Sequence, residues 1–290
     1  MLQLLGFILI TAVIAGGLIM SGGPAIFAAL PFELSLIVGA AIGTLLIGNA
    51  PSVSRQAAIG LFLALRGPKW GRDDYQSLLA TLHQLLKRAR KGGILAIESD
   101  IEAPQESDLF RANPRLLGDT DARDLICSTF RIAGLDPSAE REGGRRLRDQ
   151  IDAVVFERHR AVSALNTLAD ALPALGIVAA VLGIIKTMGV IDQSPAVLGE
   201  MIAAALLGTF LGVFLAYGLV GPLANRFGQI VEEDSLYLET IGRVLGAHFD
   251  GVPPMRCIEQ ACAELPARIR PDPVALDQAV MQAHFPRVAA

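Results

Sequence analysis

Basic residues are missing from two long stretches of this 290-residue chain. The first Lys or Arg is Arg55, and Lys186 is the only one between Arg160 and Arg226. Charged residues make up 19% of the chain and hydrophobic residues 52%, whereas soluble domains have about 25% and about 45–50%. This composition and the net charge of −4 exclude a nucleic-acid-binding protein and a disordered chain, and they indicate an integral membrane protein.

Cysteine is scarce, and no catalytic motif is present. The three cysteines are an odd number and none stands at metal-ligand spacing from a histidine, so we expect free thiols, no disulfide framework and no metal site. The chain also lacks a glycine-rich phosphate loop and a nucleophile elbow. We therefore predict no catalytic residue and no cofactor, and we expect that the protein is not an enzyme.

Four stretches are long and apolar enough to cross a lipid bilayer as helices, which takes about 20 residues. They are Leu2–Met20, Leu34–Ala50, Ala171–Ile185 (extending to about Ile191 if Lys186 reaches the interface) and Met201–Pro222. With these boundaries no Asp, Glu or His lies inside a span. The first stretch lacks the basic region of a signal peptide, so we expect it to remain on the protein.

The distribution of Lys and Arg predicts the orientation of the spans. The links Ser21–Glu33 and Thr187–Glu200 contain none, whereas residues 51–170 contain 18 and residues 223–290 contain six. Both termini and the middle segment are therefore expected in the cytoplasm. The middle segment also carries 17 acidic residues, and such a mixture of signs favours a folded, solvated domain.

Helical periodicity dominates the polar segments. Asp73–Lys91 is predicted to form an amphipathic helix, and Ile94–Ile101 to begin a second, short helix. From Arg145 the apolar spacing continues into the third span without a stop signal, which predicts one long helix. The sequence after Gly251 is rich in proline, and its end, with Pro266, Pro271, Pro273 and Pro286, is expected to be partly disordered.

The predicted fold is an all-α integral membrane protein with four transmembrane helices, whose long helices extend into a cytoplasmic helical domain. Its expected parts are the first two spans (1–50), a cytoplasmic domain (51–170), the third and fourth spans (171–222) and a cytoplasmic tail (223–290).

Small residues recur along the third and fourth spans. They include Gly176 and Gly183 in the third span and Gly208 and Gly212 in the fourth, a pattern that lets membrane helices approach closely. These residues either pack helices within one subunit or line a subunit interface. Thr209, the only Thr or Ser of the fourth span, either bonds to the carbonyl four residues earlier or lines a pore.

Pro173 and Pro222 stand at the expected cytoplasmic ends of the third and fourth spans. Neither has a backbone N–H, so the carbonyls of Ala169 and Gly218 lose their usual helical partners. The two prolines are either ordinary kinks or a pair of hinges that passes motion into the cytoplasmic domain.

The expected spans lack a carboxylate with which to relay protons, although ionisable residues in spans usually mark ion pathways. Either the protein moves no ions, or it forms the wall of a pathway whose carboxylate belongs to a partner.

Several segments resemble the MotA/TolQ/ExbB proton-channel family, and in particular its flagellar stator subunits. They are Leu172–Gly183 and Leu206–Gly218 with Pro222, which match the family's span motifs, and Arg88–Glu102, which matches its charged cytoplasmic motif. The resemblance implies a complex in the bacterial cytoplasmic (inner) membrane, with five copies of this chain around two copies of a MotB-like single-span subunit. That subunit would supply the membrane Asp, and ion flow would drive rotation.

The resemblance also implies roles for single residues of the middle segment and the spans. Arg90 and Glu98 would contact charged residues of the rotor protein FliG. Pro173 and Pro222 would couple ion binding to movement.

The ion pathway is implied in the same way. Ala180, Thr209 and Tyr217 would line it beside the partner's carboxylate. Sodium-driven relatives tend to have Thr where this chain has Ala180, so the transported ion is expected to be a proton.

Two other functions stay open. An energiser of envelope transport of the ExbB or TolQ type would share the mechanism but should have three spans and lack the motif that contains Arg90 and Glu98. A membrane scaffold that conducts no ions would agree with the missing carboxylates. An enzyme is the weakest alternative.

Overall fold

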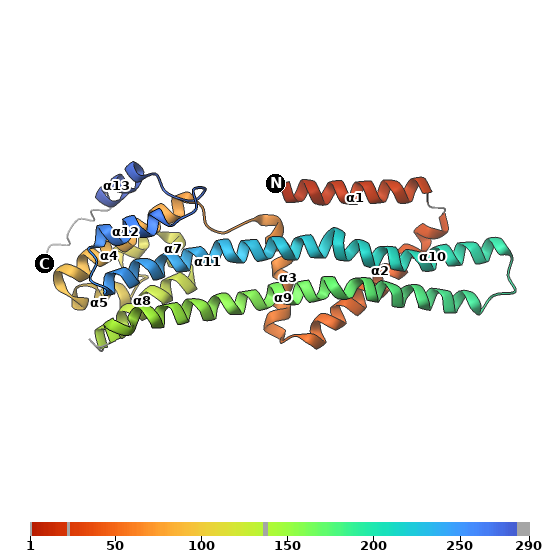
Figure 1. Cartoon of the computed structure of the whole chain (residues 1–290), viewed down its shortest axis with the longest axis horizontal. Coiled ribbons are helices and arrows are strands. Elements are labelled where there is room, and N and C mark those ends of the chain that lie inside the picture. Colours follow the sequence, from red (N-terminus) through yellow and green to blue (C-terminus); the bar gives the residue numbers. More distant parts are fainter. Residues whose placement is uncertain (1, 22–23, 136–138, 283–290) are drawn as a thin grey trace. The chain divides into compact units, whose positions relative to one another are not determined.

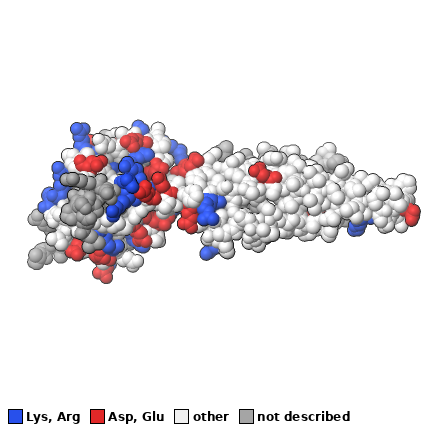
Figure 2. Space-filling model, turned by 60° about the horizontal axis from the view of Figure 1, so that its bottom comes forward, with Lys and Arg blue, Asp and Glu red and all other residues white. Residues whose placement is uncertain are grey.

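The computed structural model describes residues 2–21, 24–135 and 139–282. Within these ranges every regular element is helical (Figure 1). The chain forms two compact units, each built from two separate segments. We call Met1–Gly67 with Glu157–Val231 the membrane unit, and Pro68–Phe156 with Glu232–Ala290 the polar unit. Figure 2 shows side chains of both charges over the polar unit and few on the visible face of the membrane unit.

Among the described residues, four helices are long and apolar enough to cross a bilayer, and all four run through the membrane unit. Its elements are α1 (Leu2–Ser21), α2 (Pro24–Gly48), α3 (Pro51–Arg66), the second part of α9 (Ala139–Met188), α10 (Pro195–Val213), a π-helical turn (Phe214–Val220) and the start of α11 (Gly221–Phe249). The chain therefore has the architecture of a multi-pass membrane protein, as expected from its composition.

The expected start of the second span is wrong. The apolar stretch of α2 covers Phe27–Gly48, so Glu33 lies inside it rather than in the preceding link. One acidic residue does not outweigh the apolar residues on both sides of it, and Pro31 is accepted within the helix, as prolines often are in membrane helices. The expectation that no span contains a carboxylate is overturned by the same observation.

The third span belongs to one continuous helix of 50 residues, α9, which confirms the expected long helix. It begins at Ala139, several residues before the expected Arg145. Gly144 does not stop it, although glycine disfavours a helix interior by about 1 kcal/mol relative to alanine. The position of a Cβ on Gly144 would lie 4.0 Å from Cα of Gly246, an ordinary van der Waals distance, so α9 and α11 are neighbours here within the polar unit without depending on the glycine.

The fourth span changes its helical register just before Pro222. Seven residues, Phe214–Val220, form a π-helical turn, and the N–H of Gly221 donates to the carbonyl of Ala216, five residues earlier. Because Pro222 has no N–H for the carbonyl of Gly218, a regular α-helical register would lose a bond at this point. The wider turn was not expected from the sequence.

The polar unit is built around α4 (Arg72–Gly92), whose apolar face is buried as its periodicity predicts. Its other elements are a 3₁₀ turn (Ile94–Ile97), α5 (Glu98–Glu102), α6 (Asp108–Arg111), α7 (Pro114–Gly118), α8 (Thr120–Leu135), the end of α11, α12 (Pro254–Ala263) and α13 (Pro273–Gln282). The large core side chains Tyr75, Leu82, Phe110, Phe130 and Tyr237 are fully buried.

The tail is folded as far as Gln282, which corrects the expected disorder. Two of its prolines begin α12 and α13, where a missing N–H does no harm. Leu276 and Val280 of α13 are buried in the core, and the side chain of Gln84 on α4 donates to the carbonyl of Val280 at 2.9 Å. The rest of the tail, residues 283–290, lies outside the described residues.

Candidate functional site

The close crossing of α9 and α10 depends on glycines. A Cβ on Gly176 would lie 2.8 Å from the carbonyl oxygen of Gly208 and 2.9 Å from Cα of Gly212. A Cβ on Gly183 would lie 2.6 Å from that of Ala205. Side chains at these positions would separate the helices, so small residues allow the two spans to pack backbone against backbone.

A buried carboxylate lies beside this crossing. Glu33 of α2 is 5% exposed, and a Cβ on Gly208 would lie 3.0 Å from its Oε2 atom. The same Cβ position is 3.1 Å from the side chain of Ala179 and from the backbone nitrogen of Ala180. The carboxylate therefore uses space that a larger residue at position 208 would fill. Within the described ranges its Oε2 atom is buried and has no hydrogen-bond partner.

Sequence reasoning missed Glu33 because the second span was started one residue after it. The apolar residues from Phe27 to Phe32 were the signal that could have placed it inside a helix. Helix α2 then packs along α10, which brings Glu33 to the third and fourth spans.

Two of the three residues expected along the ion pathway, Ala180 and Thr209, lie near Gly208, whereas Tyr217 lies further along the fourth span. Ala180 is buried on α9, and it lies next to Gly208, the chain neighbour of Thr209. In the described part the hydroxyl of Thr209 does not bond to the carbonyl four residues earlier, whereas those of Thr44 and Thr187 do, at 3.0 and 2.9 Å. Tyr217 lies in the π-helical turn and is 67% exposed on the single chain.

The two expected coupling residues lie in different settings. Pro173 is half-buried inside α9, one residue after Leu172, whose carbonyl oxygen would be 2.7 Å from a Cβ on Gly212. Pro222 is exposed and lies two residues after the last residue of the π-helical turn. Pro173 thus sits at the tight helix crossing, and Pro222 at the change of register.

The two residues expected to face the rotor are exposed on the polar unit. Arg90 lies in the last turn of α4 and Glu98 begins α5. The chain turns between them at Gly93, whose φ of +69° lies in the left-handed region that favours glycine. Leu95, between the two charged residues, is 82% exposed. Neither Arg90 nor Glu98 forms an ion pair with another described residue, so both charges are available to a partner.

A neighbouring arginine has a different setting. Arg88 pairs with Asp100 at 2.9 Å, and the hydroxyl of Ser107 donates to the other oxygen of Asp100 at 2.5 Å. At the basic end of α4, Arg88 therefore binds α5, whereas Arg90 is exposed to solvent.

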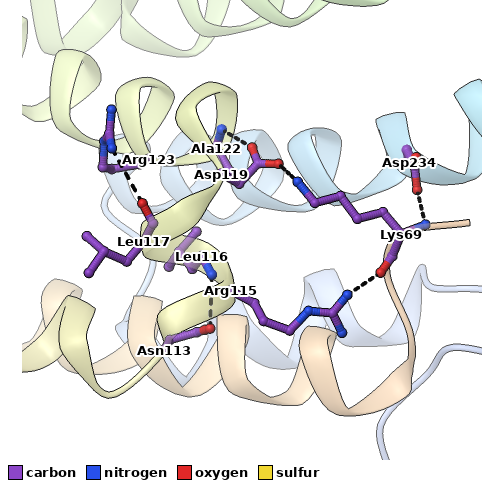
Figure 3. A network of polar contacts seen from close by, with 9 residues as sticks. All are labelled: Lys69, Asn113, Arg115, Leu116, Leu117, Asp119, Ala122, Arg123 and Asp234. Atoms are coloured by element: carbon purple, nitrogen blue, oxygen red, sulfur yellow. Dashed lines mark hydrogen bonds and ion pairs between the residues drawn. The ribbon is translucent and has the colours of Figure 1, made fainter. Parts of the chain in front are cut away.

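A second polar cluster lies at the start of α4 (Figure 3). Lys69 forms an ion pair with Asp119, and its backbone N–H donates to Asp234 at 2.8 Å. Arg115 donates to Asp74 at 2.5 Å. These contacts join α4, α7, α8 and α11, and nothing in the local sequence indicated them, because their members are far apart along the chain.

An aromatic stack completes this cluster. The ring of Trp70 stacks on Tyr237 with 3.9 Å between ring centroids, and the ammonium of Lys69 lies 4.7 Å from the Trp70 ring centroid. Burial and nearby acidic groups raise the pKa of the Tyr237 hydroxyl far above its usual value, so this residue stays neutral. The cluster acts as a rigid support for α4 rather than as a site with a free reactive group.

No group of three or more His, Cys, Asp or Glu residues that could hold a metal ion lies within residues 2–21, 24–135 and 139–282. All three cysteines are buried, and burial raises the pKa of Cys127 to about 11.

Known families match most of the chain. The model of the motility protein A N-terminal region matches residues 4–93, and that of the MotA/TolQ/ExbB proton channel family matches residues 122–240. Motility protein A of Escherichia coli is 34% identical over 99% of this chain and 97% of its own. Chemotaxis protein LafT of Vibrio parahaemolyticus is 33% identical over 93% of this chain and 95% of its own.

Solved structures show the same fold. The MotAB structure of C. jejuni gives a TM-score of 0.71 at 18% identity, covering 93% of this chain and 96% of the matched one. The flagellar MotAB stator complex of Bacillus subtilis gives 0.69 at 21% identity, covering 92% and 96%.

Proposed function

Because the chain belongs to the motility protein A branch of the MotA/TolQ/ExbB proton channel family, we propose that it is a stator subunit that couples ion flow to flagellar rotation. The observation that carries the proposal is that one chain combines two sets of features. Its tightly crossing third and fourth spans contain Ala180 and Thr209, and its polar unit exposes Arg90 and Glu98.

The proposed location is the bacterial inner membrane, with both termini and the polar unit in the cytoplasm. The absence of Lys and Arg from the residues between the first two spans supports this orientation, as does the large number of basic residues in the polar unit.

The proposed partner in the membrane is a MotB-like single-span subunit that supplies an aspartate, surrounded by five copies of this chain. Many apolar side chains of α9 and α10 are exposed on the single chain, among them Ile177, Val178 and Leu206 at 55%, 56% and 60%. They provide surface for neighbouring subunits as well as for lipid. The names of the two solved relatives describe MotAB complexes, which supports a partner of this kind.

The proposed ion is a proton, which passes Ala180, Thr209 and Tyr217 on its way to and from the partner's aspartate. The apolar side chain of Ala180 supports this choice, because a metal cation needs several oxygen ligands and Ala180 supplies none. Pro173 and Pro222 are proposed to convert the charge change into helix movement.

The proposed contact with the rotor protein FliG uses Arg90 and Glu98. Single ion pairs at an exposed surface contribute only about 0–1 kcal/mol. Such contacts form and break easily, which suits repeated engagement of a turning rotor.

The test is rotation in cells from which the gene has been deleted, with filaments counted by microscopy. Filaments that form normally but do not rotate until the wild-type gene is restored would establish torque generation. Deleted cells that still swim but lose energised uptake or envelope integrity would instead indicate an energiser of the ExbB or TolQ type. Deleted cells without either defect would leave the scaffold alternative.

A further inference from the structure

The membrane unit contains a buried carboxylate, that of Glu33. It is 95% buried inside the apolar stretch of α2, since only 5% of the residue is exposed, and its Oε2 atom has no partner within the described residues. Ionisable residues in membrane helices are expensive to insert, and they are usually found where ions pass.

The surroundings of this oxygen point to the ion pathway. The nearest atoms around the missing side chain of Gly208 are Oε2 of Glu33, Cβ of Ala179 and the backbone nitrogen of Ala180. Ala180 and Thr209, which directly follows Gly208, are the residues proposed to lie beside the partner's aspartate. The carboxylate therefore reaches the same level of the third and fourth spans from a different helix.

We propose that Glu33 is a proton-binding residue of this chain, which takes up protons from the outward side and passes them to the pathway at Ala180 and Thr209. The proposal rests on the stator function proposed above. Oε2 of the carboxylate accepts a proton from outward water and later releases it toward the pathway. No other bond forms or breaks, and the carboxylate is restored in each cycle.

The ligand is a proton rather than a metal cation because the surroundings are poor in oxygen. A hard cation requires several oxygen ligands, and the two other groups beside the Cβ position of Gly208 are the methyl group of Ala179 and the backbone nitrogen of Ala180. A proton needs only the one carboxylate oxygen that is left without a partner.

The charged groups of the surrounding helices are few. Lys186 on α9 acts on Glu33 electrostatically. The other charged or titratable residues that α3, α9 and α10 carry within the membrane unit are Glu200 on α10, Arg55 and Arg66 on α3, and Glu157, Arg158, His159, Arg160 and Asp170 on α9. Lys186 and Glu200 lie near the ends of their helices that meet at the outward link.

Two substitutions at the site separate proton binding from packing. Glu33→Gln keeps the size and the polar character of the side chain but cannot bind and release a proton in this range of pH. Glu33→Asp keeps the acid. Glu200→Gln is the matched control, because it removes an exposed carboxylate from α10.

The experiment measures rotation of a small bead attached to a flagellum, at low load and over a series of external pH values with sodium held constant. Each variant is expressed in the deleted strain, and the amount of membrane complex is measured by co-purification. We expect Glu33→Gln to form the complex in normal amount and to rotate about tenfold more slowly, as a rise of roughly 1.4 kcal/mol in the barrier to proton uptake would produce. Its speed should also no longer follow external pH. Glu33→Asp should retain the pH dependence, and Glu200→Gln should rotate normally.

Three results would overturn the proposal. Normal rotation of Glu33→Gln at every pH would remove Glu33 from the pathway, although rescue by the wild-type gene would leave the stator function intact. Loss of the complex in Glu33→Gln would make the residue structural. A speed that follows external sodium rather than pH in the wild type would replace the proton by a metal cation. Failure of the wild-type gene to restore rotation would instead count against the stator function itself.

Discussion

Arg88 and Arg90 lie two residues apart at the end of α4, yet they are expected to respond differently to substitution. Arg88→Ala removes a charged hydrogen bond to the buried Asp100, and we expect it to lower the free energy of unfolding by about 1.5–3 kcal/mol, the usual range for bonds to charged groups. Arg90→Glu changes an exposed charge and should leave stability and assembly unchanged while impairing torque. Thermal unfolding of the purified complex and rotation of tethered cells would separate the two effects. Loss of the complex in Arg90→Glu would make Arg90 structural.

Cys127 gives a prediction about pH. Burial raises its pKa from 9.0 to about 11, so the folded protein favours the thiol over the thiolate. The associated stability is complete below the pKa of the unfolded chain and is lost as the pH rises from about 9 toward 11. We therefore expect the native protein to react slowly with maleimide at about pH 8 and the denatured protein to react at all three cysteines. Rapid labelling of native Cys127 would show that its helix, α8, opens readily.

At the scale of single elements, the crossing of α9 and α10 is the most sensitive feature of the membrane unit. A Cβ on Gly212 would lie 2.7 Å from Cα of Gly176 and from the carbonyl oxygen of Leu172, and backbone atoms can yield only if the helices separate. Gly212→Ala is expected to destabilise the protein by about 1–3 kcal/mol through overpacking. Gly199→Ala, where nothing lies within 4 Å, is the control on the same helix. Equal melting temperatures of the two variants in detergent would contradict this account.

The π-helical turn gives a second prediction for this span. Pro222→Ala restores a backbone N–H that can bond to the carbonyl of Gly218, so residues 214–220 can adopt the regular α-helical register. We expect normal insertion and normal amounts of complex, with reduced rotation, because the change of register follows directly on the span that lines the pathway. Immunoblots of membranes and tethered-cell rotation measure the two quantities. A partner-bound complex with unchanged torque would make Pro222 an ordinary kink.

The elements that were predicted well from the sequence are long helices whose apolar residues recur at helical spacing over many consecutive turns. The amphipathic pattern of Asp73–Lys91 fixed α4 to within one residue at each end, and the uninterrupted pattern from Arg145 gave the long α9. The start of α2 was missed because Glu33 was assigned to the link before the second span. The helices of the tail were missed because a proline can either end a helix or begin one, and the local sequence does not distinguish the two. Contacts with distant residues, such as the hydrogen bond from Gln84 to α13, decide between a helix and a disordered chain.

The candidate site could be predicted only where its residues form a pattern along a single helix. Gly208 and Thr209 are visible as a pattern along one helix, and the roles assigned to them stay predictions. The neighbourhood of Glu33, Gly208 and Ala180 is formed by three helices, and no spacing in the sequence indicates which faces meet. The cluster around Lys69 and Trp70 was missed because its members are brought together only by the fold.

At the scale of the whole molecule, the two units differ in composition, and each has a different property that the proposed function requires. The membrane unit places a buried carboxylate and small residues along its spans, and the polar unit carries charges of both signs on its surface (Figure 2). A stator needs both properties, because ions must cross an apolar layer while torque is delivered through contacts that form and break in water. Neither unit carries out the proposed function alone.

The identity of the ion is therefore a property of the assembled motor. Ala180 contributes no oxygen ligand, and in the described part Glu33 belongs to no group of three or more His, Cys, Asp or Glu residues that could hold a metal ion, so we expect rotation to follow the proton gradient. A protonophore should stop rotation at a fixed membrane voltage, and replacing external sodium with potassium should leave the speed unchanged. Ala180→Thr adds one hydroxyl at the tight crossing beside Gly208 and is the variant in which some dependence on sodium should first be measurable. A wild-type speed that rises with sodium and resists the protonophore would mean that oxygen ligands from the partner subunit complete a cation site, and that this chain alone does not determine the ion.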